Sequence, residues 1–358
     1  MHWSMCGKRP NLRRVIYTLP LVVVAFCLSV SVARAHEVYV LSQSQIAAGF
    51  AQNNPLTLAA LNNPHNLSIF LWITVVVTLL FAGAVAFRLS RRGEWFYKKL
   101  GTFNYWGPLF VRGAIAASFF YSALTWSFLG PELSLRALPL AIIMRGILFA
   151  ASIMFILGIG VEAAAAVSLV MFFVGGYVFG WYILTYVNYL GEIVALLLFG
   201  SRRLSLDALW RGPLKRFPRL SQYETVIVRI GYGVALLYAA ISIKILHPIL
   251  TIDVVNQYHL TQFHWLFPSD PWLIVLGAAI AEIAIGIFIL IGFETQLTVG
   301  ISLVYITLSL IYFREAVWPH LMLYGISLNL IFNRTRASVD AGVGRLGEWL
   351  RARRRIDA

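Results

Sequence analysis

The sequence predicts an all-α protein of the polytopic helical membrane class, with two tandem four-helix bundles and one extra N-terminal transmembrane helix. Three observations predict it. First, the 358 residues are 59% hydrophobic and 12% charged, whereas a soluble domain has about 25% charged residues. Second, nine apolar runs approach the ~20 residues that cross a bilayer. Third, eight of these runs fall into two similar sets of four.

The N-terminal residues 1–35 have the pattern of a signal peptide. "GKRPNLRRV" is a basic region, "IYTLPLVVVAFCLSVSV" is an apolar region, and Ala33-Arg34-Ala35 is a small-x-small cleavage site. The alternative is an uncleaved first helix, and in both cases residue 36 lies outside the cytoplasm. Cys6 and Cys27 both precede the cleavage site, so removal of the leader would leave no thiol.

The apolar runs define the rest of the chain. We expect transmembrane helices near residues 67–88, 108–129, 138–158, 163–183, 186–200, 225–247, 272–292, 297–313 and 320–333. The expected organisation is an extracytoplasmic segment at 36–66, the extra helix with a basic loop at 67–107, a first four-helix repeat at 108–200, a basic linker at 201–224, a second repeat at 225–333, and a basic amphipathic tail at 334–358.

The charge distribution predicts the orientation. Loops 88–107, 201–224 and 334–358 hold 18 Lys and Arg residues, whereas the loops on the other side hold Arg136 and Arg314. Basic loops remain in the cytoplasm, so we expect an inner (plasma) membrane protein with an extracytoplasmic mature N-terminus and a cytoplasmic C-terminus. The net charge of +14 then favours anionic lipid head groups at the cytoplasmic face as partners. Since the basic residues are not interleaved with aromatic ones, no nucleic-acid partner is expected.

Two pairs of segments carry the internal repeat. "VRGAIAASFFYSAL" from Val111 resembles "VRIGYGVALLYAAI" from Val228, and "PLAIIMRGILFAASIMFILGIGVE" from Pro139 resembles "PWLIVLGAAIAEIAIGIFILIGFE" from Pro271. Four helices per copy return the chain to the same side, so the copies are parallel repeats. The copies differ at polar positions. This alignment pairs Arg112 with Arg229, Ser127 with Lys244, Ala150 with Glu282, and Asn188 with His320.

The second copy resembles the DoxX/DoxD family of small four-helix membrane proteins. The matching residues are Arg229 at the start of the first helix, Lys244 in "AISIKILHP", Glu282 in "AAIAEIAIGIFILIGFETQ" and His320 in "WPHLMLYG". The resemblance covers about 225–333 and, more faintly, 108–200. It implies a redox role, as in a subunit of thiosulfate:quinone oxidoreductase or a partner of oxidative-stress enzymes. Quinone as cofactor and a redox partner protein are expectations of this resemblance.

The same four residues, Arg229, Lys244, Glu282 and His320, are the candidates for a polar pocket. An ionisable group inside a bilayer costs at least ~2.5–3.5 kcal/mol, so its presence there is a functional hypothesis. Lys244 and Glu282 lie on adjacent antiparallel helices, where the long lysine side chain allows an ion pair. That pair is either a structural clamp or part of a pocket for a head group, a quinone or a proton. Arg229 is expected to extend toward the inner interface.

Histidines on the outward side are the candidates for a metal site. After cleavage, His36 would offer its imidazole and the free α-amine, a pair of nitrogen ligands that suits copper. The alternative is that the histidines are scattered interface residues. The candidate ligands are His36, His65, His247, His259 and His264.

Three functions remain open at this point. The first is an accessory or quinone-facing component of an extracytoplasmic redox system. The second is a binding or transport protein for a small solute or a metal such as copper. The third is a structural assembly factor. Whether the chain has catalytic activity of its own does not follow from the sequence.

Overall fold

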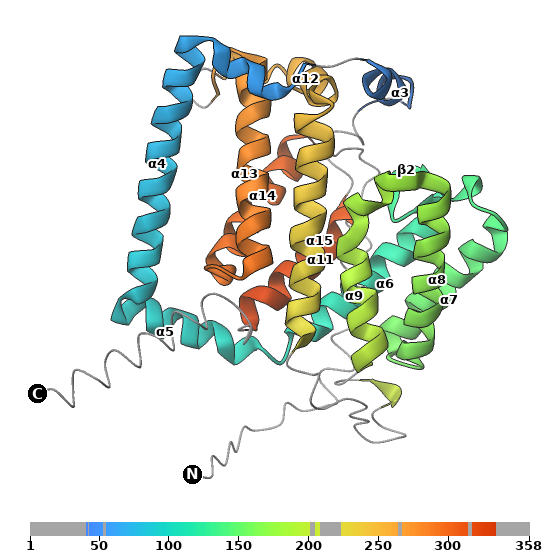
Figure 1. Cartoon of the computed structure of the whole chain (residues 1–358). Helices are drawn as coiled ribbons and strands as arrows, with labels where there is room; N and C mark the ends of the chain where they lie inside the picture. Colours follow the sequence, from blue (N-terminus) through green and yellow to red (C-terminus); the bar gives the residue numbers. More distant parts are fainter. Residues whose placement is uncertain are drawn as a thin grey trace, which may run out of the picture.

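The computed structural model describes residues 41, 43–52, 55–200, 205–207, 223–263, 267–313 and 317–333. Its described part is almost entirely helical, which confirms the predicted all-α class (Figure 1). The exception is a short antiparallel hairpin of β1 (Ser127–Phe128) and β2 (Gly130–Ser134). The predicted leader, linker and tail lie outside the described residues, apart from a few positions of the linker.

Each of the nine apolar runs contains one long helix. These are α4 (Pro64–Leu89), α6 (Gly107–Thr125), α7 (Ala141–Leu157), α8 (Val161–Phe179), α9 (Val187–Phe199), α11 (Glu224–Ala239), α13 (Pro271–Ile291), α14 (Thr295–Tyr312) and α15 (Val317–Phe332). Shorter elements connect them: α3 (Gln43–Ala51), η1 (Thr57–Asn62), α5 (Arg91–Leu100), η2 (Gly101–Phe103), η3 (Leu135–Ala137), η4 (Gly180–Tyr186), η6 (Ala240–Ile245), α12 (Pro248–Gln257) and η7 (Leu260–Gln262).

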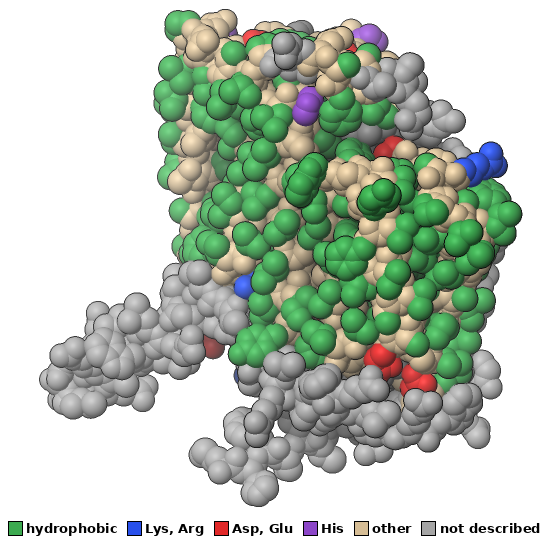
Figure 2. Space-filling model, turned by 45° about the vertical axis from the view of Figure 1, so that its right-hand side comes forward, with side chains coloured by type: hydrophobic (Ala, Val, Ile, Leu, Met, Phe, Trp, Pro, Cys, Tyr) green, Lys and Arg blue, Asp and Glu red, His purple; other side chains and the backbone are tan. Residues whose placement is uncertain are grey.

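Six helical stretches of the described residues are long and apolar enough to cross a membrane, judged by length and composition. One of them, Val161–Phe199, contains α8, η4 and α9. Since α8 packs against α9, this stretch is a helical hairpin and not one rod. Two further apolar helices, α7 and α15, are shorter. The chain is therefore a multi-pass membrane protein, and apolar side chains cover most of the face shown in Figure 2.

Eight helices form a closed ring of neighbours. Each helix packs against the next in the order α6, α7, α8, α9, α11, α13, α14, α15, and α15 packs against α6. We call α6–α9 with their connections (107–199) the first unit and α11–α15 with theirs (224–332) the second unit. The first helix of each unit thus contacts the fourth helix of the other. This pairing is reciprocal, and the internal repeat stays a prediction of the sequence.

Small residues allow the two units to approach closely. A Cβ added to Gly191 of α9 would lie 3.1 Å from the Cα of Gly231 in α11, and one added to Gly325 of α15 would lie 2.5 Å from the Cβ of Ala114 in α6. Lipid chains are as apolar as leucine, so close packing rather than hydrophobic transfer holds membrane helices together. The sequence alignment pairs Ala114 with Gly231 but does not pair Gly191 with Gly325, so the two crossings correspond only on the α6/α11 side.

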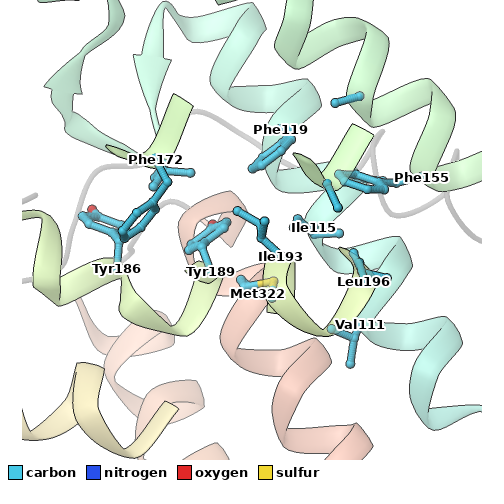
Figure 3. Packing of buried hydrophobic residues seen from close by; sticks show 14 of the residues in the cluster. Val111, Ile115, Phe119, Phe155, Phe172, Tyr186, Tyr189, Ile193, Leu196 and Met322 are labelled. Carbon is cyan, nitrogen blue, oxygen red and sulfur yellow. The ribbon is translucent and has the colours of Figure 1, made fainter. Parts of the chain in front are cut away.

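The largest buried apolar cluster lies in the first unit and at its boundary with the second. Figure 3 shows Phe119, Phe155, Tyr189 and Ile193 packed together, with Met322 entering from α15. The rings of Phe119 and Tyr189 are stacked with centroids 6.3 Å apart. Because side chains from both units meet here, the cluster fixes their relative position.

The extra helix α4 stands apart from the ring (Figure 1). No part of its apolar stretch is buried, and Trp72 is 70% exposed. It contacts α13 near its two ends, through Phe70 at one end and through Phe81, whose ring lies 5.2 Å from that of Phe288, toward the other. An exposed apolar helix of this length is stable when lipid surrounds it.

Candidate functional site

The ion pair expected between Lys244 and Glu282 is present. The Lys244 ammonium donates to both carboxylate oxygens of Glu282, at 2.8 Å and 3.0 Å, from η6 to α13. Lys244 is 2% exposed and the Glu282 side chain 12% exposed. The hydroxyl of Tyr305 in α14 donates to the same carboxylate at 3.2 Å. Three helical elements of the second unit therefore converge on one carboxylate.

The backbone that carries Lys244 is a π-helix. Residues Ala240–Ile245 have this wider turn, and the Leu246 amide donates to the Ile241 carbonyl, five residues back. Wider turns of this kind occur frequently at functional sites. The Thr57 hydroxyl, from η1 in the N-terminal segment, donates to the carbonyl of Lys244. An element far away in sequence thus stabilises the irregular turn that positions the lysine.

A small cavity with polar and apolar lining residues lies between the two units. Its volume is about 60 Å³, which is ample for water, since a water needs ~10–15 Å³ and two to four polar partners. Side chains of both units line it: Tyr182, Thr185, Tyr186, Asn188 and Tyr189 from the first unit, and Ala239, Ile243, Pro319, His320 and Leu323 from the second. Ile243 lies next to Lys244 in the chain, so the cavity is a neighbour of the ion pair.

A second carboxylate, Glu132 in the β-hairpin, is tied to this cavity. Tyr186 and Tyr182, which both line the cavity, donate hydrogen bonds to its Oε1, the latter at 3.2 Å. Gly130 makes room, because a Cβ there would collide with the Tyr186 hydroxyl. Burial raises the pKa of Glu132 to about 7, although the tyrosine hydrogen bonds lower it in part. Its Oε2 is buried, and no described residue forms a hydrogen bond with it.

The N-terminal segment covers the same region. The ring of Phe50 in α3 packs edge-on against Tyr182 of the first unit, at 6.4 Å, and against His247 of the second, at 4.8 Å. Leu41 packs with Leu250 of α12. This segment therefore joins the two units at the α3/α12 end of the molecule.

The structure separates the four residues predicted to share a polar pocket. Lys244 and Glu282 are together. His320, 3% exposed, lines the inter-unit cavity. Arg229 is also buried, at 4% exposed, and does not extend to a surface as expected. It lies 15 residues before Lys244 on the same helical stretch, which places it ~22 Å away along the axis at 1.5 Å per residue. Arg229 is therefore not part of the Lys244 pocket.

Four of the outward histidines fall within the described residues. His65 and His259 are exposed, His247 is half-buried with Nδ1 2.7 Å from the Ser242 carbonyl oxygen, and His320 lies at the cavity. Among the described residues no group of three or more His, Cys, Asp or Glu side chains is arranged to hold a metal ion. His36 and His264 lie outside the described residues, so the predicted convergence on His36 stays a prediction.

Sequence reasoning missed Glu132, Tyr182, Tyr186 and Tyr305. The carboxylate and its two tyrosines are separated by about 50 residues in the chain, and their contact depends on how the β-hairpin folds over η4. One signal was present, because Tyr182 and Tyr186 have the i, i+4 spacing that puts two side chains on one helical face. Comparison of the chain with protein-family models, curated proteins and solved structures finds no match.

Proposed function

We propose that this chain is a DoxX-like component of an extracytoplasmic redox system in the plasma membrane, with Lys244, Glu282 and Tyr305 facing the quinone pool. The observation that carries the proposal is the ion pair itself. A buried pair often stabilises no more than apolar residues of the same size, so its presence among membrane-spanning helices favours a functional role. The α3/α12 end would lie outside the cell and the basic α5 end inside.

The exposure of these three side chains supports access of a quinone from the bilayer to Glu282 and Tyr305. Lys244 is enclosed, the Glu282 side chain is 12% exposed, and Tyr305 is 40% exposed on the outer side of α14. A quinone head group has carbonyl oxygens that accept hydrogen bonds from a phenol or an ammonium. Its reduction takes up two electrons and two protons. A partner protein would supply the electrons, while Tyr305 and the ion pair would orient the ring and hold a proton.

The size of the inter-unit cavity favours this lipid-facing edge as the position of the quinone ring. A cavity of about 60 Å³ is well below the ~150 Å³ that accommodates benzene. A quinone ring is larger than benzene and does not fit there. The proposal therefore assigns the quinone to the side of Glu282 and Tyr305, and leaves the cavity to smaller species.

A double substitution tests the proposal against the purely structural alternative. Lys244→Met leaves a buried carboxylate unpaired, and Glu282→Leu leaves a buried ammonium, so each single variant is expected to lose abundance. The double variant Lys244→Met/Glu282→Leu removes both charges and should restore abundance. Quinone reduction by the reconstituted system, normalised to the amount of folded protein, is then compared between wild type and the double variant.

The two outcomes separate the readings. Restored abundance with lost quinone reduction supports a role in quinone chemistry. Restored abundance with unchanged activity per molecule would mean that the pair is a clamp, and the chain would then be a structural assembly factor. Gly277→Ala is a matched control on α13, because a Cβ at Gly277 meets no atom within 4 Å.

A second candidate function is the binding or transport of a small solute, and the cavity between the units favours it. Residues of both units line this cavity. In transporters built from two repeats, the substrate site lies at the interface between the repeats. Uptake of a small polar solute into proteoliposomes that depends on Asn188 and His320 would favour it over the redox role. Copper as the cargo predicts bound metal in the mature protein, measurable by elemental analysis and lost in a His36→Ala variant.

Helix α5 supports anionic lipid as a partner. Arg91, Arg92, Lys98 and Lys99 are exposed, and so is Trp95, whose ring lies 5.0 Å from the Lys99 ammonium. Basic and aromatic side chains on one short helix next to a membrane span suit the head-group region. Each surface lysine contributes ~1 kcal/mol near an anionic leaflet. Anionic lipid in nanodiscs should therefore raise the unfolding temperature of wild type more than that of Lys98→Gln/Lys99→Gln.

A further inference from the structure

The Oε2 atom of Glu132 is buried, and no cation of the described residues forms an ion pair with this carboxylate. The arginines of the same region are held at Trp126: the guanidinium of Arg136 lies 5.1 Å and that of Arg145 4.3 Å from its ring centre. Arg145 also donates to the Ala123 carbonyl at 2.8 Å. The groups that contact the Glu132 carboxylate are the hydroxyls of Tyr182 and Tyr186. A proton is therefore the available means of neutralising it.

The two tyrosines connect Glu132 to the cavity. Both belong to η4, and both line the cavity that Asn188 and His320 line from α9 and α15. The ring of Tyr189 lies 6.0 Å from that of Tyr186 and completes the wall. Each phenol can pass its proton to the carboxylate while its oxygen accepts one from a cavity water. The other charged pair nearby, Lys244 and Glu282, is compensated internally.

We propose that Glu132, Tyr182 and Tyr186 form a proton-exchange site that connects the α3/α12 end of the molecule, through water in the inter-unit cavity, to His320. In one direction, Glu132 releases a proton through Tyr186 to a cavity water, and the His320 imidazole accepts it. In the other direction the order reverses. No electron is transferred and no covalent bond to carbon forms or breaks.

The cavity favours protons and water over a larger ligand. Its volume of about 60 Å³ accommodates two or so water molecules at ~30 Å³ each, and its hydroxyl, amide and imidazole groups provide their partners. Chains of ionisable residues within membrane bundles mark proton relays. The raised pKa of Glu132, about 7, allows it to gain and lose a proton near neutral pH. This inference rests on the cavity and stands whether or not a quinone binds at Tyr305.

Infrared titration of the full chain in nanodiscs tests the site. A carboxylic-acid C=O band should disappear as the pH rises through about 7, and Glu132→Gln should remove that band. Tyr186→Phe deletes a hydrogen bond that stabilises the carboxylate, so the midpoint should shift upward. Glu94→Gln, an exposed carboxylate of α5, is the matched control and should leave the band unchanged.

Histidine ¹⁵N spectra test the link to the cavity. The His320 signal, assigned by its loss in His320→Gln, should change over the same pH range as the Glu132 band, and Glu132→Gln should abolish that step. The exposed His65 should not respond to the substitution. The proposal is overturned if no band is lost in Glu132→Gln, if Tyr186→Phe and Tyr182→Phe leave the midpoint of the band unchanged, or if the His320 signal is the same with and without Glu132 at every pH. Tyr186→Phe keeps the test decisive if Glu132→Gln does not fold.

Discussion

The two four-helix units surround their carboxylates differently. In the second unit, Glu282 accepts two hydrogen bonds from Lys244 and one from Tyr305. In the first unit, Glu132 accepts hydrogen bonds from Tyr182 and Tyr186, and the neighbouring arginines stack on Trp126. A lysine compensates a buried carboxylate permanently, whereas without a cation the carboxylate gains or loses its charge with pH. The same pair of residue types, glutamate and tyrosine, therefore occurs with a lysine in one unit and, among the described residues, without an ion-pair partner in the other.

The origin of this difference lies in the connection between the first two helices of each unit. In the second unit the π-helix η6 continues α11 and carries Lys244. The Thr57 hydroxyl donates a hydrogen bond to the backbone carbonyl of Lys244. In the first unit the chain leaves α6 at Thr125 and turns into the β-hairpin that carries Glu132. The aligned position, Ser127, is in that hairpin. Positions that the sequence alignment pairs, Ser127 and Lys244, thus lie in different structural elements.

The largest effect is expected from removing the cation of the second unit. Lys244→Met leaves the Glu282 carboxylate buried and unpaired, which should lower the free energy of unfolding by about 3–5 kcal/mol. Unfolding in detergent, followed by helical circular dichroism, measures the loss. Adding Glu282→Leu should recover most of it. A single variant as stable as wild type would show that water already reaches Glu282, and the contrast with Glu132 would disappear.

The next effect concerns pH. A folded-state pKa of about 7 for Glu132 against an ordinary 4.5 corresponds to up to ~3 kcal/mol of stability. Because the folded-state pKa is raised, this contribution is fully present below pH 4.5 and is lost as the pH rises through about 7. The unfolding temperature of wild type should therefore fall over this range more steeply than that of Glu132→Gln. Parallel curves for the two proteins would contradict a titrating Glu132.

The helix positions followed from the sequence because one physical requirement decides them. Apolar runs near ~20 residues have no other stable state in a bilayer than a helix, and all nine runs contain one. The ion pair also followed, since a lysine and a glutamate on neighbouring helices must find compensation. Glu132 did not follow, because its partners are set by the hairpin fold. Arg229 lies 15 residues before Lys244 on one helical stretch, ~22 Å away at ~1.5 Å per residue, and a resemblance in sequence does not contain this separation.

A third, smaller effect distinguishes the two interfaces between the units. Where α9 meets α11, both helices have glycine, and a Cβ at Gly231 would lie 2.9 Å from the Val187 carbonyl oxygen. Where α6 meets α15, Ala114 already carries a Cβ against Gly325. Gly231→Ala should therefore separate α9 from α11 and cost about 1–3 kcal/mol. Gly277→Ala, which meets no neighbour, should be neutral or slightly stabilising; equal effects of the two variants would argue against a tight α9/α11 contact.

The smallest effect compares the tyrosines that serve the two carboxylates. Tyr305→Phe removes one hydrogen bond to Glu282 at 3.2 Å, and a typical hydrogen bond contributes about 0.5–1.5 kcal/mol net. The loss should lie at the lower end, because Lys244 still donates to both oxygens and Tyr305 is 40% exposed. Tyr186→Phe should cost more at pH 8 than at pH 5, since the phenol stabilises the ionised form of Glu132. Unfolding of both variants at the two pH values measures this directly. If Tyr305→Phe shows the same pH dependence as Tyr186→Phe, the contrast between the two carboxylates disappears.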